Sequence, residues 1–314
     1  MRDTYLNTLY KLASKDKNVV SMVSDNGLIV YDDFRRDFPE RYFNFGISEG
    51  NMVAAAAGMA NCGKIPFIYT ISAFLSYRAY EFIRDDVCFQ NQNVKIVGIG
   101  TGMTYSTLGP THHTTEDIGL LRGLPNLTVF SPATRKELLW MMQETYEIDG
   151  PVYIRLGNNK EEHYLNEPVF EKGKPSVVRD GDDIAIFTTG TILNEVMEVY
   201  ERLEQGGIKA RVISVHTLKP LDASAVADLI NGIKKVVTVE EHNVISGLYS
   251  AIAEALVEEQ IAIPVLKIGL EDVFAKEYGE LGNVRQANQL DSGMIYEKIR
   301  NFYKGSEKGV CNGR

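Results

Sequence analysis

Short apolar runs alternate with longer segments whose apolar residues recur at helical spacing, and this alternation constrains the fold most strongly. The runs are apolar throughout rather than at every second position, which is typical of strands buried on both faces of a parallel sheet. One series extends from Val19–Val23 to Val152–Leu156, and a second extends from Ile184–Thr188 to Ser292–Phe302. The sequence therefore predicts an α/β fold of two doubly wound domains, a parallel-sheet domain followed by a smaller α/β domain.

A stretch rich in Asn, Gly, Pro and charged residues separates the two series. It includes Asn158, Pro168, Gly173 and Pro175, and it interrupts both the strand pattern and the helix pattern. The predicted organisation is a first domain over 1–157, a linker over 158–181, a second domain over 182–305 and a flexible tail over 306–314.

The apolar periodicity also predicts the individual elements. The expected strands are 19–23, 43–47, 65–71, 94–99, 127–130, 152–156, 184–188, 210–215, 236–239 and 265–268. The expected helices are 4–13, 48–60, 74–89, 116–122, 132–146, 192–205, 223–230, 246–259 and 292–302.

Charge and composition argue against several classes of function. The net charge is −9 and the Lys and Arg residues are scattered, so no broad basic face for nucleic acid is expected. No apolar run is long enough to span a bilayer, and the N-terminus lacks the apolar core of a secretory signal. Cys62, Cys88 and Cys311 are far apart and lack metal-ligand spacing, which fits a reducing compartment. We therefore expect a cytoplasmic protein with no membrane or nucleic-acid partner.

Glu49 is placed where a strand is expected to lead into a helix. An aromatic run ends at Gly46, and an alanine-rich helix is expected to begin at Ser48. A carboxylate at this point has two readings, a stabiliser of the first helical turn or an acid–base group in an apolar site. Position alone favours the first reading, because carboxylates are common in first helical turns.

Four motifs in a fixed order favour the acid–base reading of Glu49 instead. GISEGNM begins at Gly46, SAFLSYRAYEFIRDDV at Ser72, GPTHHTTED at Gly109 and GPVYIRLG at Gly150. In this order they resemble the pyrimidine-binding domain of thiamine-diphosphate enzymes of the transketolase superfamily. The second domain, with GDDIAIFTTGT, TLKPLD and VVTVEEHNVISG, is similar to the C-terminal domain of that family.

The resemblance also implies a partner chain. Family members bind the cofactor diphosphate and a divalent metal through a Gly-Asp-Gly motif with a downstream Asn, on a separate domain. This sequence has no such motif, since Asp180-Gly181-Asp182 is a linker turn. The chain thus resembles the small subunit of a split transketolase. That resemblance implies thiamine diphosphate, Mg²⁺ or Ca²⁺ bound mainly by a diphosphate-binding subunit, and a heterotetramer that is inactive without that subunit.

The same resemblance assigns the cofactor residues. Glu49 matches the glutamate that hydrogen-bonds the aminopyrimidine and promotes proton loss from the thiazolium C2. Phe74 matches the aromatic residue that stacks on the pyrimidine, and Tyr77 is its neighbour; core aromatics of an amphipathic helix are the alternative for both. Asp25 resembles an aspartate near the positive ring of the cofactor across a subunit contact, with an Asx-turn residue as the alternative.

Substrate residues follow from the resemblance in the same way. His112 matches a histidine that contacts the substrate carbonyl and hydroxyls, and a histidine in a Gly/Thr loop has no evident core role. Arg155 matches an arginine that binds the substrate phosphate, and Arg2 resembles a second one. Arg78 resembles an arginine near the substrate of deoxyxylulose phosphate synthases, although an ordinary surface arginine fits equally.

Leu108 departs from the family pattern. Transketolases usually place an acidic residue there to read sugar hydroxyls, and an aliphatic side chain cannot accept hydrogen bonds. Either the sugar is held differently, or the substrate is unusual, such as a deoxy, branched or nucleotide-linked sugar. The expected reaction is transfer of a two-carbon ketol unit from a ketose or ketose phosphate donor to an aldehyde or aldose acceptor. The alternatives are an enzyme that uses a 2-oxo acid, resembling deoxyxylulose phosphate synthase or the beta chain of an oxo-acid dehydrogenase, and a non-catalytic subunit.

Overall fold

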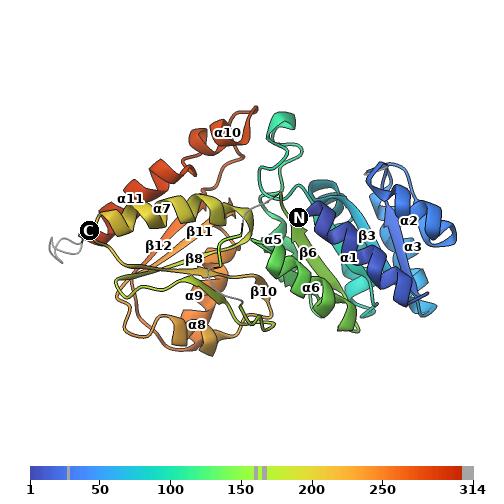
Figure 1. Cartoon of the computed structure of the whole chain (residues 1–314), viewed down its shortest axis with the longest axis horizontal. Helices are drawn as coiled ribbons and strands as arrows, with labels where there is room; N and C mark the ends of the chain where they lie inside the picture. The colour runs from blue at the N-terminus through green and yellow to red at the C-terminus, as the bar shows by residue number, and fades with distance from the viewer. Residues whose placement is uncertain (27–28, 159–161, 165–167, 306–314) are drawn as a thin grey trace.

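Two β-sheets, each covered by helices on both faces, form adjacent domains in the computed structural model (Figure 1). The structure describes residues 1–26, 29–158, 162–164 and 168–305. The expected tail over 306–314 and part of the expected linker lie outside these residues. The predicted α/β fold with two doubly wound domains is confirmed.

In the described residues the first sheet has seven strands in the order β10-β5-β6-β4-β3-β1-β2. All neighbours pair in parallel except β10, which joins β5 antiparallel. Its strands are β1 Val19–Val23, β2 Tyr42–Asn44, β3 Ile65–Ile71, β4 Lys95–Ile99, β5 Thr128–Phe130, β6 Val152–Leu156 and β10 Thr217–Lys219.

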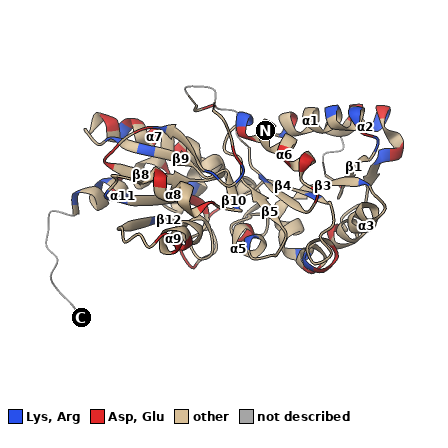
Figure 2. Ribbon diagram, turned by 90° about the horizontal axis from the view of Figure 1, so that it is seen from below, with Lys and Arg blue, Asp and Glu red and all other residues tan. Residues whose placement is uncertain are grey.

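Alternate side chains of these strands feed two apolar cores. One core joins the sheet to α1 and α6, and the other joins it to α3, α4 and α5 on the opposite face (Figure 2). The bounds are α1 Arg2–Lys15, α2 Asp32–Asp37, α3 Glu49–Asn61, α4 Tyr80–Phe82, α5 Asp117–Arg122 and α6 Arg135–Glu147. Short 3₁₀ segments lie at Ile29–Tyr31, Pro39–Arg41 and Ser106–Leu108.

The second sheet has five described strands in the order β12-β11-β8-β9-β7, with β7 antiparallel at one edge. Helices α7 and α11 cover one face and α8 and α9 cover the other. The strands are β7 Ser176–Arg179, β8 Ile184–Thr188, β9 Ala210–Ser214, β11 Val236–Asn243 and β12 Val265–Leu270. The helices are α7 Leu193–Gln205, α8 Ala223–Leu229, α9 Leu248–Glu258, α10 Leu281–Ala287 and α11 Ser292–Lys304, with a 3₁₀ turn at Gly190–Ile192.

Several features differ from the sequence-based expectation, and helices α2 and α10 were not predicted. Ser176–Arg179, expected in the linker, forms β7 because it pairs with β9. Thr217–Lys219, in the second domain, completes the first sheet as β10, so the two domains share a sheet edge. The helix expected over 74–89 is instead two π-helical segments, Phe74–Arg78 and Ile83–Cys88, on either side of α4.

Acidic and basic side chains are interspersed over the helices rather than gathered on one face (Figure 2). Among the described residues, no single helix is both long enough and apolar enough to cross a membrane.

Candidate active site

A tight turn at the carboxyl end of the first sheet positions Glu49. Gly46 has φ of +64°, a conformation that glycine adopts without strain, and it redirects the chain from β2 into α3. The Ser24 hydroxyl, just after β1, donates to the Gly46 carbonyl at 2.5 Å and accepts from the Ser48 amide at 3.2 Å. These bonds fasten the turn to the neighbouring strand, so Glu49 opens α3 as a buried residue.

A continuous line of contacts joins Glu49 to three other predicted site residues. Arg78 Nη1 donates to Glu49 Oε2 at 3.1 Å, and the Arg78 guanidinium lies 5.0 Å from the centre of the Phe74 ring. The Phe74 ring in turn meets the His112 ring edge to face, with ring centres 5.1 Å apart. Glu49, Arg78, Phe74 and His112 therefore form one cluster at the carboxyl end of the sheet.

The π-helical segment explains how Phe74 and Arg78 come together. A π-helix is wound more widely than an α-helix, and π-helical turns are frequent at functional sites. The two side chains are four positions apart and stack on the same side of the segment. The sequence indicated a helix here, but the wider winding was not predicted.

Tyr77 contacts Glu116, the residue just before α5. Its hydroxyl donates to Glu116 Oε2 at 2.5 Å and accepts from the Glu116 amide at 3.2 Å. Burial, with the nearby Asp117 charge and the bond to Glu116, raises the pKa of Tyr77 well above its usual range. Tyr77 is thus a neutral donor at the edge of the cluster, and no sequence pattern indicated Glu116 as its partner.

Asp25 lies in the turn after β1. Its φ is +47°, its amide donates to Asn44 Oδ1 at 3.0 Å, and its carboxylate accepts from Asn44 Nδ2 at 3.5 Å. These contacts fit the turn role, and they place Asp25 at the same end of the sheet as Glu49. A role toward the cofactor stays a prediction.

Arg155 does not join the cluster, and the substrate-phosphate role expected for it is not supported. Its Nε donates to Asp117 at 3.0 Å, and its Nη2 donates to the carbonyls of Thr114 at 3.0 Å and Glu241 at 3.1 Å. The Tyr153 hydroxyl adds a bond of 2.7 Å to Asp117. Because this guanidinium is buried and satisfied by protein groups, Arg155 fastens the two domains together.

Arg2 lines a separate cavity of about 510 Å³. The cavity opens at the carboxyl ends of β3, β4 and β6, and Arg135, Thr104 and Tyr105 also line it. Arg2 forms an exposed ion pair with Asp3 at 3.2 Å. Thr104 and Tyr105 belong to the loop that carries His112, which links this cavity to the cluster along the chain.

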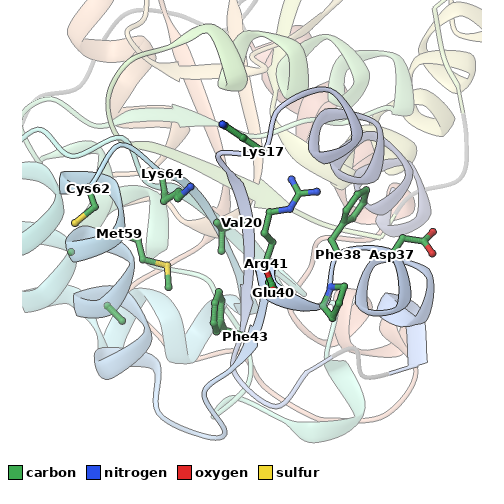
Figure 3. A pocket seen from close by; sticks show the side chains of 13 residues that line it. Lys17, Val20, Asp37, Phe38, Glu40, Arg41, Phe43, Met59, Cys62 and Lys64 are labelled. Atoms are coloured by element: carbon green, nitrogen blue, oxygen red, sulfur yellow. The ribbon is translucent and has the colours of Figure 1, made fainter.

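A larger cavity, of about 900 Å³, lies at the opposite end of the sheet (Figure 3). Its lining includes Lys17 and Val20 at the start of β1 and Lys64 just before β3. Ligands of open α/β sheets bind outside the carboxyl ends of the strands. We therefore place the candidate site at the Glu49 cluster rather than in the larger cavity.

The sequence did not indicate the carboxylates behind the cluster, which are the half-buried Glu116 and the buried Asp117 and Glu241. A signal was present in Val236–Asn243, where an apolar strand ends in three consecutive ionisable residues and stays buried almost to its end. His113, beside His112, is also buried, and both its ring nitrogens lack a hydrogen-bond partner among the described residues. Burial lowers the pKa of His113 against the opposing effect of the Glu241 and Glu116 carboxylates.

Comparison with known proteins agrees with this geometry. Residues 1–161 match the transketolase pyrimidine-binding domain family, and residues 173–291 match the transketolase C-terminal domain family. A 6-deoxy-6-sulfo-D-fructose transketolase subunit from a Clostridium species is 37% identical over 284 residues, covering 90% of this chain and 87% of that protein. One of the subunits of an apulose-4-phosphate transketolase from Actinobacillus succinogenes is 34% identical, covering 84% of this chain and 85% of that protein.

A solved structure extends the likeness to three dimensions. A split-gene transketolase, described as an inactive beta4 tetramer, superposes with a TM-score of 0.85 at 35% identity, covering 96% of each chain. The chain therefore belongs to the transketolase family and joins that family's pyrimidine-binding domain to its C-terminal domain.

Proposed function

We propose that this chain is the small, cofactor-binding subunit of a thiamine-diphosphate-dependent transketolase. It works with a partner subunit that carries the diphosphate-binding domain, and it transfers a two-carbon ketol unit from a ketose to an aldehyde acceptor. The observation that carries the proposal is Glu49, a buried carboxylate at the carboxyl end of a parallel sheet, bound by Arg78, whose guanidinium lies over the Phe74 ring.

The cluster fits an aminopyrimidine ring. Such a ring presents nitrogen atoms at its edge and flat apolar faces, so it suits a carboxyl group beside an aromatic side chain. Glu49 would hold a proton against a ring nitrogen, and the half-buried Phe74 would cover a ring face. When bound, thiamine diphosphate supplies a nucleophilic carbon that accepts the two-carbon unit.

Arg78 is suited to be replaced by the cofactor pyrimidine as the hydrogen-bond partner of Glu49. The guanidinium side chain is 55% exposed while Glu49 is 2% exposed, so solvent can take over the charge of Arg78 at little cost. The contact would hold Glu49 in place until the pyrimidine replaces it. Arg78 would then be free to face a substrate, in line with its expected role.

His112 is placed to contact the substrate oxygen atoms. Its Nδ1 is 3.0 Å from the Thr111 hydroxyl, and within the described residues Nε2 has no hydrogen-bond partner. A donor at Nε2 can stabilise negative charge that develops on a substrate oxygen. The Thr111 contact would fix the ring so that Nε2 keeps facing the site.

The substrate is proposed to be an unusual sugar with an anionic end. Leu108, which is 52% exposed, cannot accept the hydroxyl hydrogen bonds that an acidic residue would. Arg2 and Arg135 line the neighbouring cavity and favour a phosphate or a similar anion there. The names of the two related subunits refer to a sulfo-sugar and to apulose 4-phosphate, so relatives of this chain differ in their sugars.

Reconstitution tests the proposal. The purified chain, its diphosphate-binding partner, thiamine diphosphate and Mg²⁺ should together consume hydroxypyruvate or a ketose phosphate, while the chain alone should not. Glu49→Gln should lower turnover by about 10²–10⁴-fold, because it removes an acid–base group from the site. Glu81→Gln, an exposed change on α4, is the matched control and should leave turnover unchanged.

Three outcomes would contradict the proposal. Turnover by the single chain would remove the partner requirement. Near-normal turnover by Glu49→Gln would remove the central residue. Activity with pyruvate and release of carbon dioxide, in place of ketol transfer, would identify the 2-oxo-acid alternative instead.

A further inference from the structure

The loop between β4 and α5 carries His112 and is long for a catalytic loop. Its two limbs meet at one point, where Gly102 and Thr114 exchange backbone hydrogen bonds of 2.9 and 2.8 Å. Beyond this bridge the loop extends through the 3₁₀ turn Ser106–Leu108 to His112. A loop of this length needs external contacts to hold one conformation.

A side chain of the second domain supplies the most direct of these contacts. Glu241, in β11, accepts a hydrogen bond of 2.6 Å from the Met103 amide through Oε1. Gly102, the residue before Met103, must be glycine, because a Cβ there would lie 2.3 Å from Glu241 Oε1. The carboxylate therefore lies directly against the base of the loop.

Arg285 holds Glu241 in this position. Arg285 Nε, on α10, donates to Glu241 Oε2 at 2.6 Å, and Arg285 Nη1 donates to Glu195 Oε1 at 3.0 Å. Glu241 and Arg285 are both buried. A charge-assisted hydrogen bond in such a setting is stronger and better oriented than one between neutral groups in water.

Further bonds from the second domain reach the same loop. The Asn243 amide donates to the Thr115 carbonyl at 2.7 Å, and the Gly279 amide donates to the Ser106 carbonyl at 3.0 Å. Figure 1 shows α10 beside this loop, at the top of the molecule. The second domain thus contacts both limbs and the outer part of the loop.

We propose that Glu241, oriented by Arg285, positions the loop that carries His112, so that the C-terminal domain sets the substrate-facing geometry of a site in the first domain. Glu241 is a positioning residue, since it acts through the Met103 amide and contacts no reacting atom. The inference rests on the proposed function, because it gives His112 its role toward the substrate.

Hydrogen exchange on the full chain tests the positioning without any turnover. Glu241→Ala should raise amide exchange of Met103 and of the loop to His112 at least tenfold. The control is Glu254→Ala, which removes the pair with Arg122 between α9 and α5, with bonds of 2.7 Å. That pair also joins the two domains but does not touch the loop, so the control should leave loop exchange unchanged.

Kinetics of the complex with the partner subunit and thiamine diphosphate tests the consequence. Glu241→Ala should lower kcat/KM for the donor at least tenfold, with cofactor affinity within twofold of the wild type. Glu241→Gln, which keeps an acceptor but loses the charge, should fall between Glu241→Ala and wild type. In a His112→Ala background, adding Glu241→Ala should lower kcat/KM by less than a further twofold, because both changes then remove the same interaction.

Specific results would overturn the inference. Loop exchange at the wild-type rate in Glu241→Ala would show that the contact does not order the loop. If the losses of kcat/KM caused by Glu241→Ala and His112→Ala multiply in the double variant, Glu241 has a merely structural role. If Glu241→Ala does not fold, Glu241→Gln carries both measurements, and wild-type behaviour there refutes the inference. Faster exchange together with a fully active His112→Ala would instead refute the proposed role of His112.

Discussion

Two carboxylate–guanidinium pairs of nearly equal length have opposite characters in this molecule. Arg78 approaches Glu49 at 3.1 Å and Arg155 approaches Asp117 at 3.0 Å. The Arg78 side chain is 55% exposed and the Arg155 side chain 4%. Distance alone therefore does not distinguish a candidate site from an architectural contact, whereas exposure and the number of partners do.

The physical difference lies in what each arginine leaves behind when it moves. Removing Arg155 strands the buried Asp117 carboxylate, and the carbonyls of Thr114 and Glu241 lose a donor. Removing Arg78 takes a donor from the buried Glu49 carboxylate, but the Arg78 side chain is 55% exposed, so a ligand or water can reach the position that it leaves. We therefore expect the first pair to be fixed and the second to be exchangeable, as a binding site requires.

The largest expected effect is on stability at the domain junction. Arg155→Ala should lower the free energy of unfolding by about 3–5 kcal/mol, because it leaves a buried charge without its partner. Urea denaturation followed by circular dichroism measures this change. Arg78→Ala is the matched comparison and should change the same quantity less than Arg155→Ala does, because the Arg78 side chain is 55% exposed and water can replace it beside Glu49.

Equal losses in the two variants would break the comparison. If Arg78→Ala destabilised the chain as strongly as Arg155→Ala, the Glu49 cluster would be part of the architecture. If Arg155→Ala were neutral, the junction would not depend on the buried pair.

A smaller effect concerns His216, at the start of the segment that carries β10 into the first sheet. Its ring is buried against Trp140, with ring centres 5.0 Å apart, and Nε2 is 3.1 Å from the Ser176 hydroxyl. Burial lowers the pKa of His216 from 6.5 to about 4. Because the folded-state pKa is the lower one, the unfolded chain binds the proton first as pH falls.

The stability that neutral His216 contributes should therefore be complete above pH 6.5 and lost as pH falls toward 4. The loss amounts to roughly 3 kcal/mol over that window. His216→Gln should flatten this part of the pH dependence, measured by urea denaturation at each pH. An unchanged slope would show that His216 stays accessible to protons in the folded chain.

The sequence predicted the regular parts of the fold because they follow from local patterns. Strands β1, β3, β6 and β8 have the predicted bounds, since each is an uninterrupted apolar run. Ser176–Arg179 and Thr217–Lys219 were missed because they are short, and only pairing with distant strands makes them β-structure. The π-helical winding at Phe74 was missed because helical periodicity does not distinguish it from an α-helix.

The candidate site divides in the same way. Glu49, Phe74, Arg78 and His112 were identified from motifs, and the structure brings them into contact. Arg155 belongs to an equally clear motif, but its surroundings come from Asp117 and Glu241, 38 and 86 positions away along the chain. No local pattern shows whether an arginine at a strand end faces a ligand or a buried carboxylate.

A crystal structure of the complex of this chain with its diphosphate-binding partner and thiamine diphosphate tests the central claim most directly. We expect a Glu49 oxygen within hydrogen-bond distance of a pyrimidine nitrogen, the Phe74 ring against the pyrimidine, and Arg78 released from Glu49. A pyrimidine bound elsewhere, or Glu49 still paired with Arg78 and facing solvent, would contradict the proposed role of this subunit.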